Sequence, residues 1–250
     1  MKLVQLNIFG GKFLDDALEF LRKEDPDIVT LQEVLVSRKL DVFNAVKDAT
    51  GLSGVFAKAS GFRSAGGIAR FGNAVFSRYG ISSSKSVFLD FPYRIMGTRR
   101  SVNYYDVEEL LTEPRNFISA VLDTPSGRLR VASVHMAWSE KCTERWHRIE
   151  AARKMVRYLL GKTPTVIAGD FNTHPESVSF GIINKYFHNF GDGMKNTLNP
   201  KRHSIFLREP RGLVVDYVLG RGVSGKARAV DADVSDHLPL ASEIKINGKS

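Results

Sequence analysis

Short apolar runs that each stop at a polar residue, and that alternate with helical repeats, constrain this chain more than any other feature of its sequence. The alternating run 2–7 stops at Asn7, and the apolar run 28–31 lies just ahead of Glu33. Between these runs, leucines recur through residues 14–24 at the spacing of one helix face. The pattern predicts a strand, a helix and a second strand, a succession that is typical of an α/β protein.

The second half of the chain repeats this alternation. A hairpin is predicted from residues 117–134, with its turn at Pro125-Ser126-Gly127 and with His135 directly after it. A helix predicted after Thr143 carries Trp146 among the apolar residues of one face. Further strands are predicted at residues 165–168, 213–219 and 238–246.

The region between the first strands and the hairpin gives weaker patterns. A second helix is predicted at residues 37–49, with Ser37 as its cap. Residues 51–114 are rich in glycine and serine and have poor periodicity, with short strand-like pieces such as Ala74-Val75-Phe76, so we expect long loops there. Because the sequence shows no internal repeat, linker or low-complexity segment, we expect one domain over residues 1–250.

Composition limits the class of protein. The 250 residues are 43% hydrophobic and 25% charged, which is typical of a globular chain that buries a sizeable core. No apolar run reaches the roughly 20 residues that span a bilayer, and the N-terminus lacks a signal-peptide pattern. We therefore expect a cytoplasmic protein without a membrane span. The single Cys142 cannot form an internal disulfide, and no Cys/His signature around it indicates a nucleophile.

The net charge favours anionic partners. The chain has 36 Lys and Arg against 27 Asp and Glu, which leaves +9 at pH 7. Such an excess attracts polyanions over a long range, and nucleic acid, acidic lipid head groups and small phosphates all satisfy it. Nothing in the sequence indicates an obligate protein partner.

The polar residues at the predicted strand ends each have a structural explanation when taken alone. Asn7 suits a turn, Glu33 a solvated surface, and Asp170-Phe171-Asn172 an Asx turn. Together with their flanking segments they closely resemble the endonuclease/exonuclease/phosphatase superfamily, in the family's order and from the first strand to the last. The segments are Leu6-Asn7, Leu31-Gln32-Glu33-Val34, Gly72-Asn73-Ala74-Val75-Phe76-Ser77-Arg78, Val134-His135, Gly169-Asp170-Phe171-Asn172, Val215-Asp216-Tyr217-Val218 and Ser235-Asp236-His237-Leu238-Pro239-Leu240.

The resemblance implies a fold and a chemistry. The implied fold is a four-layer α/β sandwich, in which two mixed sheets pack face to face with helices outside and the site lies at one edge. The implied activity is metal-dependent hydrolysis of phosphate esters by in-line attack of an activated water. Hard cations such as Mg²⁺ or Mn²⁺ prefer oxygen ligands. The metal ligands are then expected to be Asn7, Glu33 and Asp236.

The same resemblance assigns roles to the remaining residues of the motifs. Asp170 orients or deprotonates the attacking water, and Asn172 donates a hydrogen bond to the phosphoryl oxygen. The two residues lie two apart, so in an extended chain both face the same side. His237 contacts the phosphate, and Asp216 holds its tautomer and raises its pKa.

His135 separates branches of the family. Abasic-site endonucleases resemble this chain less, since they usually have Asn at this position and a further polar residue where this chain has Phe9. The comparison favours the branch with deoxyribonucleases, deadenylases, sphingomyelinases and inositol-phosphate phosphatases. In the deoxyribonucleases this histidine pairs with a glutamate, which the sequence does not identify here. Arg115 is expected either to contact phosphate or to form a structural ion pair.

Two stretches are candidates for contact with substrate. Basic and aromatic residues interleave from Tyr93 to Tyr105, including Arg94, Arg99 and Arg100, which suits phosphate pairing and base stacking. Trp138 is a second stacking candidate. We therefore expect a nuclease, and the alternatives are a phospholipid or sphingomyelin phosphodiesterase, an inositol or small-molecule phosphatase, and a catalytically silent nucleic-acid-binding module. The complete set of motif residues argues against the silent module.

Overall fold

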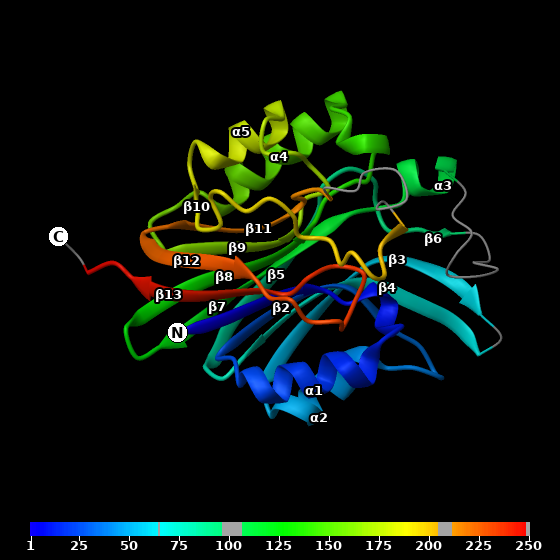
Figure 1. Cartoon of the computed structure of the whole chain (residues 1–250), viewed down its shortest axis with the longest axis horizontal. Helices are drawn as coiled ribbons and strands as arrows, with labels where there is room; N and C mark the ends of the chain where they lie inside the picture. Colours follow the sequence, from blue (N-terminus) through cyan, green and yellow to red (C-terminus); the bar gives the residue numbers. More distant parts are fainter. Residues whose placement is uncertain (65, 97–106, 205–211, 249–250) are drawn as a thin grey trace.

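The computed structural model describes residues 1–64, 66–96, 107–204 and 212–248, and it contains two mixed β-sheets packed face to face (Figure 1). Sheet A has the order β12 (Val223–Ala229), β13 (Leu240–Ile246), β1 (Lys2–Asn7), β2 (Ile28–Val36), β4 (Gly67–Ser77), β3 (Ser53–Ser64) and β6 (Ile95–Met96). Sheet B has the order β10 (His188–Asn189), β11 (Asp216–Arg221), β9 (Thr165–Asp170), β8 (Gly127–His135), β7 (Asn116–Thr124) and β5 (Gly80–Phe88).

Helices cover the outer face of each sheet, as Figure 1 shows. Sheet A is covered by α1 (Leu14–Glu24) and α2 (Val42–Thr50), and sheet B by α4 (Trp146–Leu159) and α5 (Val178–Asn184). The short elements are η1 (Phe9–Gly11), α3 (Val107–Thr112) and η2 (Glu140–Cys142). The four-layer sandwich that the sequence predicted is confirmed. None of the helices within the described ranges has the length and apolar character needed to cross a membrane.

The core between the sheets is apolar. Leu3, Ile28 and Val75 of sheet A pack in one cluster with Val131 and Val218 of sheet B. Burial of such side chains stabilises the sandwich by roughly 25 cal/mol for each Å² of apolar surface removed from water. Two further clusters fill the space between each sheet and its helices, so the site residues stand on strands that are packed from both sides.

The prediction of long loops over residues 51–114 is wrong. Three strands, β3, β4 and β5, occupy half of it, with lengths of 12, 11 and 9 residues, and the strand-like piece Ala74-Val75-Phe76 lies in β4. Glycine has a packing role here, because a Cβ on Gly72 would lie 2.0 Å from the Ala57 carbonyl oxygen of the neighbouring strand. The pairing of β3 with β4 also shifts register between Lys58 and Ser60, which breaks the alternation that sequence patterns detect.

Two details of the predicted helices are also wrong. Helix α2 begins at Val42, and Asp41 caps it by accepting a hydrogen bond from the Asn44 amide at 3.0 Å. The expected cap, Ser37, closes a turn with Leu40 instead. At the start of α4, Trp146 is 76% exposed rather than buried.

Strand β12 and helix α5 were not predicted, and β11 begins at Asp216 rather than at residue 213.

Candidate active site

Strand register brings three of the predicted residues together in sheet B. The parallel strands β8 and β9 place His135 opposite Asp170, at the end of both strands. The antiparallel strand β11 begins opposite the same position and places Asp216 beside Asp170. In sheet A, Asn7 ends β1 opposite Gln32, the residue before Glu33. The strand ends that the sequence singled out therefore meet at one edge of the sandwich.

Hydrogen bonds tie the two sheets together at this edge. The Asn7 amide donates from Nδ2 to Asp170 Oδ2 at 3.1 Å and so links β1 to β9. Deeper in the core, Gln5 Nε2 donates to Asp216 Oδ1 at 3.0 Å, and Gln32 Nε2 donates to Ser133 Oγ at 3.0 Å. The glutamines are fully buried, and sequence reasoning gave them no role. We define Gln5, Gln32, Ser133 and Asp216 as the intersheet polar layer.

The turn after β9 sets the geometry of Asp170 and Asn172. A Cβ on Gly169 would lie 2.0 Å from the Val134 carbonyl oxygen, so only glycine allows β8 and β9 to approach this closely. Asn172 adopts a positive φ of 48° and donates its backbone N–H to Asp170 Oδ1 at 2.8 Å. The buried Arg148 of α4 donates to the Asn172 carbonyl oxygen and holds the turn from the helix side.

Asp170, Asp216 and His237 form one electrostatic unit. His237 Nδ1 donates to Asp216 Oδ2 at 2.8 Å, and its Nε2 lies 3.8 Å from Asp170 Oδ2. Burial lowers the pKa of His237, but the carboxylates around it outweigh burial and raise that pKa well above the ordinary value. Burial raises the pKa of Asp170 to about 6, and the charge of Asp216 adds to the rise while that of His237 opposes it.

The partner of His135 is an arginine. Arg115 Nη1 lies 3.2 Å from His135 Nδ1, and Arg115 Nη2 lies 2.9 Å from Glu113 Oε2. A guanidinium can only donate, so Nδ1 accepts and the imidazole proton stands on Nε2. That Nε2 lies 3.4 Å from Asp170 Oδ2. Glu113 therefore acts on His135 through Arg115, where the deoxyribonuclease pattern implied a direct glutamate contact.

Glu33 and Asp236 form the acidic side of the site. β2 shifts register between Leu31 and Val34, and Glu33 adopts a positive φ of 58°, a strained conformation for any residue but glycine. Burial raises the pKa of Asp236 to about 6, and the negative charge of Glu33 contributes to the rise. The negative charge of Glu33 therefore opposes the ionisation of Asp236.

This acidic side fits a hard divalent cation. A cation between Glu33 and Asp236 would relieve their repulsion, and both supply the oxygen donors that Mg²⁺ and Mn²⁺ prefer. Asn7 Oδ1 accepts the Phe9 N–H at 3.1 Å and retains a second lone pair for a metal. The chemistry of the donors thus agrees with the predicted ligand set of Asn7, Glu33 and Asp236.

The Endonuclease/Exonuclease/phosphatase family model matches residues 4–237. This chain belongs to the endonuclease/exonuclease/phosphatase family. Members of the family are phosphoester hydrolases. No curated protein sequence matches the chain.

Solved structures share the family fold over nearly the whole chain. An endonuclease/exonuclease/phosphatase family protein from Leptotrichia buccalis is 14% identical, with a TM-score of 0.72 and coverage of 98% of this chain and 99% of that one. The human Nocturnin catalytic domain with bound sulfate anion is 16% identical, with a TM-score of 0.67 over 99% and 94%. Mannosyl-6-phosphatase Bt3783 from Bacteroides thetaiotaomicron is 15% identical, with a TM-score of 0.65 over 98% and 99%.

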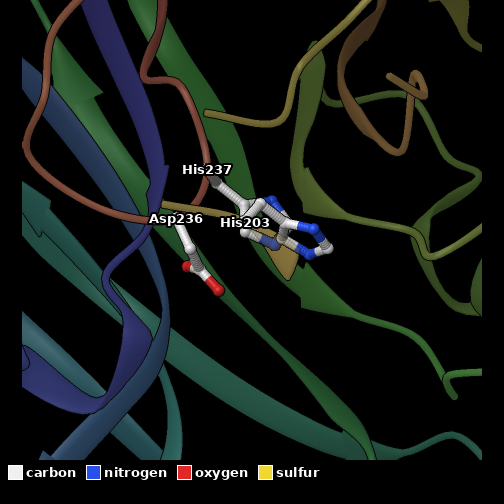
Figure 2. A group of neighbouring side chains, drawn as sticks. All are labelled: His203, Asp236 and His237. Atoms are coloured by element: carbon white, nitrogen blue, oxygen red, sulfur yellow. The ribbon is translucent and has the colours of Figure 1, made fainter. Parts of the chain in front are cut away.

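His203 is a site residue that sequence reasoning missed. Its ring lies edge-on to that of His237 with the centroids 5.7 Å apart, and it adjoins Asp236 as well (Figure 2). Burial lowers the pKa of His203 to about 3, and the charge of His237 adds to the fall. No motif of the family marks this position, and it follows no predicted strand, so no sequence signal pointed to it.

The residues that were predicted to bind substrate differ in their positions and contacts. Arg99 and Arg100 lie outside the described residues. Arg94 donates to the carbonyl and hydroxyl oxygens of Thr112 at 2.7 and 2.6 Å, so it serves the protein's own structure here. Trp138 is half-buried beside the site strand β8. Arg115 is committed to Glu113 and His135, in agreement with the ion-pair alternative for its role.

Proposed function

We propose that this protein is a Mg²⁺- or Mn²⁺-dependent phosphodiesterase that hydrolyses nucleic acid. The observation that carries the hydrolytic part is the convergence of Asn7, His135 and His237 on the single carboxylate oxygen Oδ2 of Asp170. Three polar groups that point at one oxygen in a buried, preorganised setting form a place where a phosphate and its attacking water are bound.

The side chains supply complementary parts of an in-line displacement. Asp170 accepts a hydrogen bond from the attacking water and takes its proton. His237, protonated on both nitrogens, donates from Nε2 to a non-bridging phosphate oxygen while Asp216 holds Nδ1. His135 donates from Nε2 as a neutral hydrogen-bond donor. Glu33, Asp236 and Asn7 would hold a divalent cation, which would neutralise the charge that develops on the phosphoryl oxygens.

Charge and an exposed aromatic residue support nucleic acid as the substrate. The net charge of +9 favours a polyanion. Trp146, the first residue of α4, is 76% exposed, and it lies two residues before Arg148, which donates to the Asn172 carbonyl oxygen. Its indole offers an exposed stacking surface on the helix that reaches this turn. The fold likeness to the human Nocturnin catalytic domain agrees with this proposal, whereas the likeness to a mannosyl-6-phosphatase agrees with the small-phosphate alternative.

Substrate panels and salt titration test the proposal. DNA, RNA, sphingomyelin, inositol phosphate and a small chromogenic phosphodiester are each assayed with Mg²⁺ and with Mn²⁺. Binding of single-stranded DNA and RNA is measured with Asp170→Asn, which is expected to bind without turnover. Each phosphate contact should contribute roughly −0.7 to −0.9 to the slope of log affinity on log salt.

Substitutions that remove positive charge test which arginines contact the nucleic-acid phosphates. Arg99→Gln and Arg100→Gln should flatten the salt slope and leave hydrolysis of the small phosphodiester unchanged. Lys245→Gln, on the exposed far end of β13, is the matched control and should change neither. If binding is weak and indifferent to salt while a lipid or an inositol phosphate is hydrolysed readily, the nuclease assignment fails and the corresponding alternative replaces it.

A further inference from the structure

His203 belongs to a group of three side chains whose donor atoms differ from the oxygen-rich side of the active site. One ligand atom each from His203, Asp236 and His237 lie within 4.8 Å of one another (Figure 2). Two of the three donors are imidazole nitrogens. Nitrogen donors select Zn²⁺, Cu²⁺, Ni²⁺ and Co²⁺ over Mg²⁺, which prefers oxygen and keeps its waters. We propose that these three residues form a second cation site, selective for a nitrogen-preferring divalent ion such as Zn²⁺, and that its occupation inhibits hydrolysis.

The histidine from the catalytic unit is already oriented as metal-bound histidines are. His237 uses Nδ1 for its 2.8 Å hydrogen bond to Asp216, so Nε2 is the nitrogen that is left to bind a metal. A carboxylate that fixes the far nitrogen is the usual support of a zinc-bound imidazole, because it sets the ring orientation and increases its basicity. Asp170, Asp216 and Asp236 also surround this ring with negative charge that favours a cation at Nε2.

Asn199 holds the two segments of the proposed site in register. Its backbone N–H donates to the Asp236 carbonyl oxygen at 2.7 Å, and its side chain donates to the Ser235 carbonyl oxygen at 2.8 Å. Its own carbonyl oxygen accepts the His203 N–H at 2.9 Å. One residue thus anchors His203 to the loop that carries Asp236 and His237, and the three ligands come from a tethered scaffold.

The neighbouring arginine does not compete for the site. Arg202 pairs with Asp233 and, at 3.4 Å, with Asp16, and its guanidinium stacks on Phe13 with 3.6 Å to the ring centroid. Its positive charge is therefore directed to other acids. Ligand atoms on one tetrahedral zinc ion lie roughly 3.4 Å apart, so side-chain shifts on the order of 1 Å close the site around an ion, with water in the fourth position.

Occupation has a direct consequence for the chemistry. A metal on Nε2 of His237 removes the hydrogen that this nitrogen donates to phosphate, and it ties Asp236 to a second ion. Binding itself rests only on the geometry, whereas the effect on hydrolysis rests on the proposed function. The three residues are thus expected to bind Zn²⁺ whatever the protein hydrolyses. If the protein is a phosphodiesterase, the bound Zn²⁺ inhibits it.

Zinc titration of the whole chain tests the proposal. With Mg²⁺ saturating, calorimetry should show one Zn²⁺ bound per chain, and Co²⁺ should give visible d–d absorption at the same stoichiometry. His203→Gln keeps a polar side chain of similar length and should weaken Zn²⁺ binding at least about tenfold and abolish the Co²⁺ bands. His174→Ala removes an imidazole that lies 4.0 Å from Glu176 on the surface, and it should change neither.

Activity distinguishes the two parts of the proposal. Zn²⁺ should inhibit Mg²⁺-supported hydrolysis of the small phosphodiester, and His203→Gln should need at least about tenfold more Zn²⁺ for half-maximal inhibition, with the rate of each protein expressed relative to its own zinc-free rate. Equal Zn²⁺ affinity in wild type and His203→Gln overturns the site. Zinc bound through His203 without inhibition overturns the regulatory role. Absence of hydrolysis of every phosphoester with Mg²⁺ overturns the proposed function, and the titration still decides the site.

Discussion

The guanidinium of Arg115 stands 3.2 Å from Nδ1 of His135, in the position where a carboxylate would make the histidine a strong proton acceptor. Because arginine offers only donors, His135 is confined to the tautomer with its proton on Nε2. A second proton on the ring would break the contact with Arg115. His135 is therefore suited to donate a hydrogen bond to phosphate and is unsuited to act as a proton-releasing acid.

We expect nitrogen NMR of histidine-labelled protein to show His135 as the Nε2–H tautomer between pH 6 and 8. Arg115→Met should release this preference and lower kcat. It should also destabilise the protein by about 3 kcal/mol, because it removes the positive charge that pairs with the buried Glu113 carboxylate. Arg128→Met, which removes a mostly exposed partner of Asp123, is the control and should cost little in urea unfolding. An Nδ1–H tautomer in the wild type contradicts the assignment.

Asp170→Asn and His237→Ala should each lower kcat by on the order of a hundredfold or more, because each removes a group that handles a proton or stabilises charge in the transition state. The double variant should lose less than the product of the single losses, since the two side chains act as a unit. Rates are measured on the true substrate, with circular dichroism as the test of folding. Near-normal turnover in either variant would show that the centre lies elsewhere.

The rate should fall at acid pH. Asp170 must be ionised to take a proton from water, and its pKa is raised to about 6, so its protonated fraction grows as pH drops below that value. With saturating Mg²⁺ we expect kcat/KM to decline by about tenfold for each pH unit below the acid limb, as loss of one essential base requires. A flat profile between pH 5 and 7.5 would exclude Asp170 as the base.

Hydrolysis should require a divalent cation and should disappear with chelator. Glu33→Gln removes one of the two carboxylates at the acidic side and should raise the Mg²⁺ concentration needed for half-maximal rate by at least about tenfold, with the fold intact. Glu243→Gln, on the exposed face of β13, is the matched control. Undiminished turnover in excess chelator would refute the metal dependence.

Trp146→Ala should weaken oligonucleotide binding roughly tenfold, because stacking contributes about 1–3 kcal/mol per base. Hydrolysis of the small phosphodiester should be unchanged. Tyr158→Ala is a control on the same helix, since this ring is 45% exposed and lies near the opposite end of α4. Equal losses in both variants would remove the special role of Trp146.

The sequence predicted the strand ends well because their signal is local. Asn7 and Asp170 end buried apolar runs, and the motif Gly169-Asp170-Phe171-Asn172 requires a close strand approach that only glycine permits. Of strands β3 to β5, only the piece Ala74-Val75-Phe76 of β4 was recognised, because glycines, serines and register shifts remove the alternation that identifies a strand. Hydrophobic periodicity reports burial, and many side chains of β3 and β5 are exposed.

The partners in the site could be predicted less well, because they depend on contacts distant in sequence. Arg115 reaches His135 across neighbouring antiparallel strands, and His203 reaches His237 through the anchor at Asn199. The positive φ of Glu33 arises from a bulge against β4 that leaves no mark in the residues themselves. Sequence reasoning therefore paired His237 with Asp216, but it did not pair His135 with Arg115 or His203 with His237.

The intersheet polar layer couples the packing of the two sheets to the alignment of the site residues. Gln5 and Gln32 fasten one sheet to Asp216 and Ser133 of the other directly beneath the reacting groups. A core substitution that slides one sheet by a fraction of an ångström would misalign donors and base long before it melts the fold, because misplacement of about 1 Å can cost a hundredfold in rate. The rate of hydrolysis of a small phosphodiester should then respond to a shift between the sheets more sensitively than the melting temperature measured by calorimetry. Core substitutions that leave the melting temperature unchanged should still lower this rate.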